Sequence, residues 1–208
     1  MCAGVRAVVA EGATVGLRVT VQKANYRELP RFVRLARDLG VHQVSFLAVD
    51  VSNPHAFGRD RAFADDLALD AKDLQEMEAL IAHMEREFAA EFARGFIAES
   101  PRKLRGLHAY FGALLGQGAF PPVRCNAPEF SAVIGVHGQI SPCFFIPGPA
   151  GELAGADPAA ALDSASMQAL RADIRAGRRG ECARCVCSMW RDPSAIDGLS
   201  LRSREASA

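Results

Sequence analysis

The chain has 208 residues, of which 50% are hydrophobic, and its 24 Lys and Arg residues balance its 24 Asp and Glu residues. This length and apolar content suffice for one large domain or for a medium and a small one. Zero net charge argues against a nucleic-acid partner, because proteins that bind phosphate backbones carry clustered Lys and Arg. No window approaches the roughly 18 apolar residues of a membrane helix and no secretory signal is evident, so we expect a soluble, cytoplasmic protein without a membrane partner.

The first part of the chain predicts a βαβ unit. Runs of β-branched residues indicate strands, an apolar stripe with helical spacing indicates the helix between them, and glycines mark the ends. The crossover of such a unit should be right-handed. The expected elements are a helix over residues 3–11, a strand over 15–21, a helix over 29–39 that ends at Gly40, and a buried strand over 41–49.

Asn25 follows the first of these strands and precedes the helix. Together with Glu28 it makes an Asn-x-x-Glu capping signal, so its side chain either caps the helix or contacts a bound cofactor. Ligands gather at the carboxyl ends of parallel strands, and the polar stretch 50–69 is long enough to be a functional loop. Other polar residues expected near such a site, with solvated loop positions as the alternative for each, are Gln22, Lys23, Asp50, Ser52, Asn53 and His55.

Three more helices are expected further along the chain. Each begins at a residue that can accept a hydrogen bond from the first turn, and the third should deliver the last cysteines to their site. They run from Asp70 through Phe92 with Leu69 and Leu74 as a hydrophobic staple, from Ser100-Pro101 to Gly116, and from Ser164 or Ser166 to Gly177, with a loop over residues 147–160.

Most cysteines lie in the C-terminal half of the chain. Cysteines that only pack as small apolar side chains should scatter over both halves, and a cytoplasmic protein rarely holds disulfides. Metal or cluster ligation is therefore the leading interpretation, with reactive or plain packing cysteines as the alternative. Cys2 is interpreted as an ordinary residue, and the five candidates for ligation are Cys125, Cys143, Cys182, Cys185 and Cys187.

The spacing of these cysteines predicts two half-sites. Cys182 and Cys185 lie on one tight turn and point at a common centre. Residues 131–141 predict a β-hairpin that turns at Gly138, and such a hairpin brings the segments before and after it together.

Cys125 and Cys143 flank that hairpin. The seventeen residues between them exceed the short knuckles of structural zinc sites, which favours an iron–sulfur cluster over zinc. Cys187 either replaces Cys185 as the fourth ligand, binds a partner metal, or packs. Trp190 is interpreted as a packing residue beneath the cysteine turn.

The pattern of Cys125, twelve residues, Gly138, four residues, Cys143, a gap, and Cys182-x2-Cys185 resembles the auxiliary-cluster region of radical S-adenosylmethionine enzymes. More specifically it looks like the twitch domain, a shortened relative of the SPASM domain. The resemblance implies that these four cysteines hold one auxiliary [4Fe–4S] cluster. A full SPASM domain has further cysteines for a second cluster, whereas only Cys187 follows here.

The sequence before the cysteines extends this resemblance. Residues 16–21, Asn25 and residues 40–46 are similar to the last βαβ portion of the family's partial barrel. The implied fold class is α/β, with residues 1–99 as the C-terminal part of a partial (β/α) barrel. Residues 100–208 would then form a small α+β, cysteine-rich twitch/SPASM-like domain with a β-hairpin.

The family's Cys-x3-Cys-x2-Cys loop, which holds the cluster that cleaves S-adenosylmethionine, is absent from this sequence. We therefore expect a C-terminal fragment that does not cleave S-adenosylmethionine alone and whose auxiliary cluster transfers electrons to or from a substrate radical. S-adenosylmethionine and a second [4Fe–4S] cluster are implied only for the full-length parent. The implied partners are a peptide or small-molecule substrate and a redox protein such as ferredoxin or flavodoxin. The alternatives are a zinc-stabilised binding module and an adaptor subunit that completes a partner's barrel.

Overall fold

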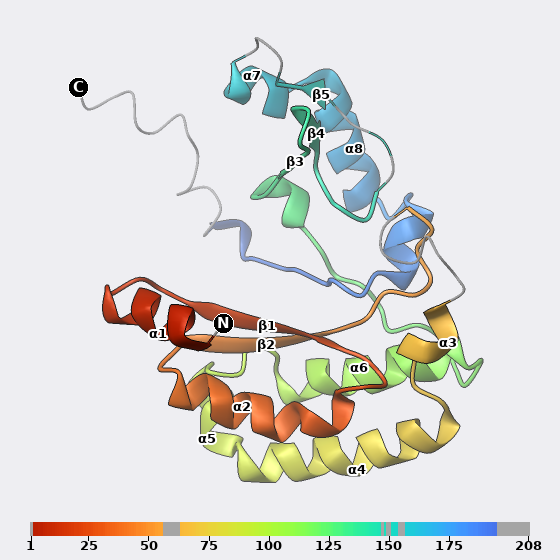
Figure 1. The fold of residues 1–208 in the computed structure, drawn as a ribbon. Coiled ribbons are helices and arrows are strands. Elements are labelled where there is room, and N and C mark those ends of the chain that lie inside the picture. The colour runs from red at the N-terminus through yellow and green to blue at the C-terminus, as the bar shows by residue number, and fades with distance from the viewer. Residues whose placement is uncertain (1, 56–62, 147, 149–150, 154–156, 195–208) are drawn as a thin grey trace. The chain divides into compact units, whose positions relative to one another are not determined.

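A computed structural model describes residues 2–55, 63–146, 148, 151–153 and 157–194 (Figure 1). The chain divides into two compact units, the first formed by residues 1–51 and 60–121 and the second by residues 52–59 and 122–208. The fold is mixed α/β, as the sequence predicts, with one parallel and one antiparallel sheet. The boundary at residue 99 stays a prediction. No helix in the described ranges is long and apolar enough to cross a membrane.

The first unit is built on a parallel pair of strands. Strands β1 (Gly16–Val21) and β2 (Gln43–Ala48) pair in a register that sets Val19 opposite Phe46, and α2 (Leu29–Asp38) connects them. The predicted strand, helix and strand are therefore confirmed. Gly40 has a φ of 72°, a conformation that favours glycine, and it ends the helix as expected.

A third segment continues this sheet for a short distance beside β2. Val44 and Ile97 form an isolated parallel bridge. Beyond it the N–H of Phe46 donates to the carboxylate of Glu99 at 2.8 Å instead of to a strand carbonyl. Glu99 is 5% exposed, so a buried carboxylate takes the place of a strand carbonyl as the acceptor for Phe46 at the edge of the sheet.

Helices cover one face of this sheet. In Figure 1, α2, α4 (Ala71–Glu87) and α6 (Pro101–Leu114) lie on the same side of β1 and β2. Phe46, Met77 and Phe111 are fully buried among them, whereas Arg18 and Thr20 of β1 are exposed. The sheet therefore has an apolar, covered face and a polar, open face. The remaining helices of this unit are α1 (Cys2–Ala10), η1 (Tyr26–Glu28), α3 (Ala64–Leu67) and α5 (Ala89–Ala93).

The N-caps of α4 and α6 agree with the sequence. Asp70 accepts hydrogen bonds from the first turn of α4 and forms a capping box with Asp73. Ser100 caps α6 by accepting from Lys103. The helix expected to continue through Phe92 instead breaks at Phe88, whose φ of −109° and ψ of 29° leave the helical region. Phe88 is 2% exposed, so its ring packs in the core at the break.

The second unit contains the predicted hairpin, with β3 (Val133–Ile134) pairing antiparallel with β4 (Gln139–Ser141). Gly138 turns the chain with a φ of 83°. The predicted loop over 147–160 is wrong in part, because β5 (Gly151–Glu152) adds a third strand and α7 (Pro158–Leu162) begins there. Asp157 caps α7, and a proline and three alanines follow it. This sequence is typical of a helix start, but the helix is too short to show an apolar periodicity.

A small core supports the second unit. Ile140 of β4 and Met167 of α8 (Ala165–Arg175) are fully buried and pack with Ala161. Ser164 caps α8 by accepting from the N–H of Met167, which decides between the two expected start residues. The η4 (Ala127–Glu129) and η5 (Gly180–Arg184) 3-10 helices complete the unit. The tail over 201–208 lies outside the described residues.

Candidate metal centre

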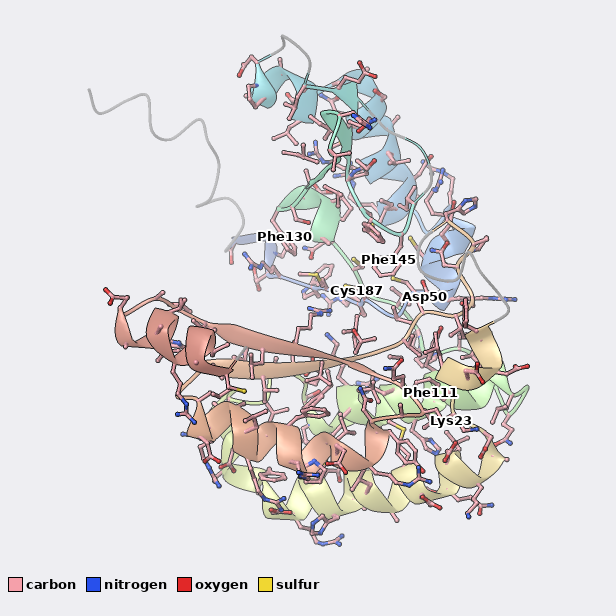
Figure 2. All side chains as sticks on the ribbon, viewed as in Figure 1. Lys23, Asp50, Phe111, Phe130, Phe145 and Cys187 are labelled. Carbon is pink, nitrogen blue, oxygen red and sulfur yellow. The ribbon has the colours of Figure 1, made fainter. Side chains whose placement is uncertain are left out.

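The second unit brings its five cysteines onto three segments. Cys125 precedes η4, Cys143 follows β4, and the remaining three lie in and after η5. All five are partly buried, and no disulfide joins any of the chain's six cysteines, all of which lie in the described ranges. Figure 2 labels Cys187 on the last of these segments. Cys2 is exposed on α1 in the other unit.

The five thiols lie near enough to affect one another electrostatically. Burial, with smaller contributions from Cys125, Cys182 and Cys187, raises the pKa of Cys143 to about 11, although the Phe145 N–H partly offsets the rise. Burial raises the pKa of Cys185 to about 12, with contributions from Cys187, Cys143 and Cys125. Each of these three segments is thus electrostatically coupled to the other two.

Three of the cysteine sulfurs accept backbone hydrogen bonds in the same local geometry. The N–H two residues further along donates to the Sγ of Cys125 at 3.5 Å, of Cys143 at 3.4 Å and of Cys185 at 3.3 Å. Such bonds stabilise the thiolate form, which is the form that binds metal, and hydrogen bonds to sulfur also tune iron–sulfur clusters. The recurrence of this turn at three of the four predicted ligands suits a metal centre.

Arg179 places a positive charge beside Cys182. Burial raises the pKa of the Cys182 thiol, as do Cys125 and Glu181, while the Arg179 guanidinium lowers it by less. One end of that guanidinium pairs with Glu181 at 2.8 Å. Its Nε is buried and has no hydrogen-bond partner among the described residues. Because an unpaired buried donor is costly, this atom is suited to an acceptor such as a thiolate or sulfide.

Asn126 joins the first and third cysteine segments. Its Nδ2 donates to the carbonyl of Arg191 at 2.8 Å, and its Oδ1 accepts from the Arg191 N–H at 2.9 Å. Its own N–H donates to the carbonyl of Met189 at 2.9 Å. The Ser188 hydroxyl adds a hydrogen bond to the carbonyl of Arg124 at 2.8 Å. Asn126, buried at 7% exposure, therefore fixes Cys125 opposite the chain that follows Cys187.

Asn53 braces the second cysteine segment. Its Nδ2 donates to the carbonyl of Phe145 at 2.8 Å, and its Oδ1 accepts from the N–H of His55 at 2.9 Å. Phe145 also supplies the N–H that reaches the sulfur of Cys143. The sequence predicts Asn53 near a ligand site at the carboxyl ends of the parallel strands, and this stays a prediction. In the structure its side chain supports the second cysteine segment. The exposed His55 takes part only through its backbone in these contacts.

The side chains do not adopt the spacing of a single-ion site. Among the described residues, no three His, Cys, Asp or Glu side chains are placed to coordinate one ion. Four sulfurs around one zinc would lie about 3.8 Å apart, from a Zn–S bond of about 2.3 Å and tetrahedral geometry. The thiols of a cubane bind four different irons and so stand further apart. The donor set and the orphaned Arg179 Nε fit the larger centre.

Asn25 lies in the loop after β1, but its side chain does not cap the next helix. Its Oδ1 accepts from the Gln22 N–H at 2.9 Å and its Nδ2 donates to the Thr20 carbonyl at 3.0 Å. The capping prediction is therefore wrong, because the amide satisfies backbone groups at the end of β1 and Glu28 pairs with Arg31 instead. The alternative, contact with a bound cofactor, stays a prediction.

The other polar residues near β1 and β2 have structural contacts. Lys23 pairs with Asp70 at 2.8 Å, and this hydrogen bond raises the pKa of Lys23. Gln22 contributes its backbone to the loop, and Asp50 is 5% exposed. The sequence does not reveal the supporting residues Asn126 and Arg179. Their only signal is position, since each lies within three residues of a predicted ligand.

Comparison with protein-family models, with curated proteins and with solved structures finds no significant match to this chain. The proposals that follow therefore depend on the residues and their geometry.

Proposed function

We propose that this chain binds one auxiliary [4Fe–4S] cluster through Cys125, Cys143, Cys182 and Cys185. The observation that carries the proposal is the gathering of partly buried thiols from three separate segments into one electrostatic neighbourhood. When bound, such a cluster supplies a one-electron donor and acceptor. Because four thiolates occupy all four irons, electron transfer to or from a substrate radical suits it better than direct binding of substrate.

Backbone hydrogen bonds favour the thiolate form at three of the four proposed ligands. The N–H groups of Ala127, Phe145 and Cys187 donate to the sulfurs, which favours thiolate over thiol. Asn126 and Asn53 fix the backbones of the segments that carry them.

Arg179 offsets negative charge at the site. Four thiolates give the loaded centre a net negative charge, and burial makes such charge costly. The guanidinium beside Cys182 compensates part of it, and its buried Nε–H is a donor without a partner among the described residues.

The first unit supports the wider proposal that the chain is the C-terminal part of a radical S-adenosylmethionine protein of the SPASM type. Its parallel strands continue into the bridge between Val44 and Ile97, and the open face of the sheet is polar. A barrel interior that receives a cofactor or substrate would present such a face. S-adenosylmethionine and its own cluster are proposed for the parent only, with a ferredoxin or flavodoxin as the electron source.

Anaerobic reconstitution of the full chain with iron and sulfide tests the cluster. We expect about four irons and four sulfides per chain, as for one cubane held by four cysteines. Serine at any of the four ligands should lower both contents, whereas C2S is the matched control and should not. C187S should also leave them unchanged.

Metal analysis of the anaerobically purified protein distinguishes the iron–sulfur cluster from the alternative, a zinc-stabilised module. A zinc-stabilised module would contain about one zinc and take up no iron and sulfide. That result would overturn the proposal. Equal iron contents in C182S and C2S would refute the assignment of the ligands.

A further inference from the structure

The second unit contains a groove beside the cysteine centre. Its volume is about 1300 Å³, and its lining comes from the η4 region, α8 and the segment after the last cysteine. Pockets for small molecules typically enclose about 300–1,000 Å³, so this groove has room for a longer ligand. Cys125 lines one side of it. The other lining residues used below are Arg124, Phe130, Arg171, Arg175 and Trp190.

Arg124 presents its donors to the groove. Its guanidinium stacks on the ring of Trp190, with the central carbon 3.7 Å from the ring centroid. Stacking fixes the plane of the guanidinium but leaves its N–H groups available at the edge. Its charge helps to lower the pKa of Asp192, after hydrogen bonds from Ser194, but no ion pair joins Arg124 to any described carboxylate.

Arg171 is a second cation with spare donors. Its Nε–H donates to the carbonyl of Pro128 at 2.8 Å, which holds the side chain against η4. Within the described ranges, its two Nη groups have no hydrogen bond or ion pair. Arg175, in contrast, is already paired with Glu129 at 2.9 Å. Arg124 and Arg171 are thus the two lining arginines that form no ion pair with a carboxylate of the described residues.

Aromatic surface accompanies these charges. Trp190, the only tryptophan in the chain, is 44% exposed. It is therefore not fully packed beneath the cysteine turn, contrary to what the sequence suggests. Phe130 also lines the groove, and Arg191 lies over its ring at 4.6 Å. Figure 2 labels Phe130 in this unit. Tryptophan and arginine are both enriched among the residues that dominate binding at protein interfaces.

We propose that this groove binds an acidic peptide segment. Its carboxylates would pair with Arg124 and Arg171, whose planar guanidinium groups match a carboxylate in a bidentate manner. Its apolar side chains would lie against Trp190 and Phe130. The volume favours a peptide over a small anion. This inference goes beyond cluster binding and does not require the cluster, although Cys125 makes the two sites adjacent.

Calorimetric titration of the full chain tests the proposal, and Trp190 fluorescence reports whether the ligand reaches the groove. The probe is acetyl-Glu-Phe-Glu-Leu-Glu-amide, and its counterpart with three glutamines is the control peptide. We expect the acidic peptide to change the fluorescence and to bind about tenfold or more tightly than the control, as charge-assisted hydrogen bonds imply. Equal affinity for the two peptides would overturn the proposal.

Variants locate the binding. R171Q should lower the affinity for the acidic peptide by about tenfold, because it removes the charged guanidinium donors without changing Trp190. R178Q is the matched control, because Arg178 is exposed, pairs with Asp173 at 2.7 Å and lies outside the groove lining. If R171Q fails to fold by circular dichroism, R124Q replaces it with calorimetry as the readout. Unchanged binding in the folded variant would refute the site.

Small anions separate the two possible ligand sizes. Glutarate and inorganic phosphate are titrated under the same conditions, and we expect each to bind far more weakly than the peptide. If either matched the peptide, the groove would be a small-anion site and the peptide proposal would fail. Iron content, measured on the same samples, keeps this outcome separate from that of the cluster.

Discussion

The hydroxyl of Tyr26 donates a hydrogen bond to the carboxylate of Asp73 at 2.9 Å, although 47 residues separate them in the chain. Both side chains are buried, at 0% and 4% exposure. Arg27 reaches the same carboxylate at 3.0 Å, and the Asp70 N–H also donates to it. The Tyr26 hydroxyl also lies 2.8 Å from the carboxylate of Glu76, which pairs with Arg27 as well. Asp73 and Glu76 together thus join the loop after β1 to α4.

Removing either member of this pair should destabilise the first unit. D73N should cost about 1–3 kcal/mol, because Arg27 and the Tyr26 hydroxyl lose one of their two carboxylate acceptors and keep only Glu76. Y26F should cost less, and the double variant should cost less than the sum because the two residues share one interaction. Urea unfolding followed by circular dichroism measures this. E78Q on the exposed side of α4 is the control, and strict additivity would contradict the coupling.

Acid should weaken the same region through Asp70. The hydrogen bond from Lys23, followed by backbone N–H groups, lowers the pKa of Asp70 to about 2. Its value in the unfolded chain is about 3.9, so its stabilising contribution is present above about pH 4 and is lost as the pH falls to about 2. D70N keeps a good N-cap without the charge, so the stability of this variant should depend less on pH over that range. Unfolding curves at several pH values would show the difference, and identical slopes would contradict it.

Glu99 should respond in the opposite direction. Burial raises the pKa of its carboxyl, an effect that the Phe46 N–H, Lys103 and Arg18 only partly offset. The folded state therefore holds this proton more tightly than the unfolded state, and stability falls as the pH rises between the two pKa values. E99Q keeps an acceptor for Phe46 and should remove this loss at pH 7–8. E99A leaves that N–H unpaired and should cost about 1–3 kcal/mol at any pH. A stability of E99Q below that of E99A would refute this account.

Asn126 should keep the first and third cysteine segments in fixed positions. N126A leaves the N–H and carbonyl of Arg191 without their partner, which should cost about 1–3 kcal/mol locally. Amide exchange at Arg191 should become faster, and less iron should be incorporated in reconstitution. Q168A is the control in the same unit, because within the described residues the side chain of Gln168 bonds only to Asp163, at the surface. Unchanged exchange at Arg191 would show that the amide is not needed.

Arg179 should tune the proposed cluster. R179Q removes the positive charge beside Cys182, so the loaded protein should be harder to reduce while its iron content stays near that of the parent chain. A redox titration followed by electron paramagnetic resonance measures the potential. R178Q alters a nearby exposed charge and should leave the potential nearly unchanged. Equal shifts in the two variants would indicate a general charge effect instead.

The sequence predicts elements that depend on local chemistry. Asp70 and Ser100 cap helices as expected, and Gly40 and Gly138 turn the chain with positive φ. In each case one residue type satisfies a local backbone requirement, so the pattern alone is informative.

Predictions that depend on distant contacts are less reliable. Asn25 has the right spacing for a cap, yet its amide is taken by the backbone around the end of β1. The helix break at Phe88 accompanies burial of its ring, which no helical propensity indicates. At the candidate site, sequence spacing singles out the cysteines but not Asn126, whose partner at Arg191 is 65 residues away.

That separation has a consequence for the order of events during synthesis. The hydrogen bonds between Asn126 and Arg191 can form only after residue 191 has left the ribosome, so Asn126 waits through the synthesis of 65 further residues for its partner. The first unit, whose strands and helices are near neighbours along the chain, can fold earlier. Insertion of the proposed cluster would then follow the folding of the first unit.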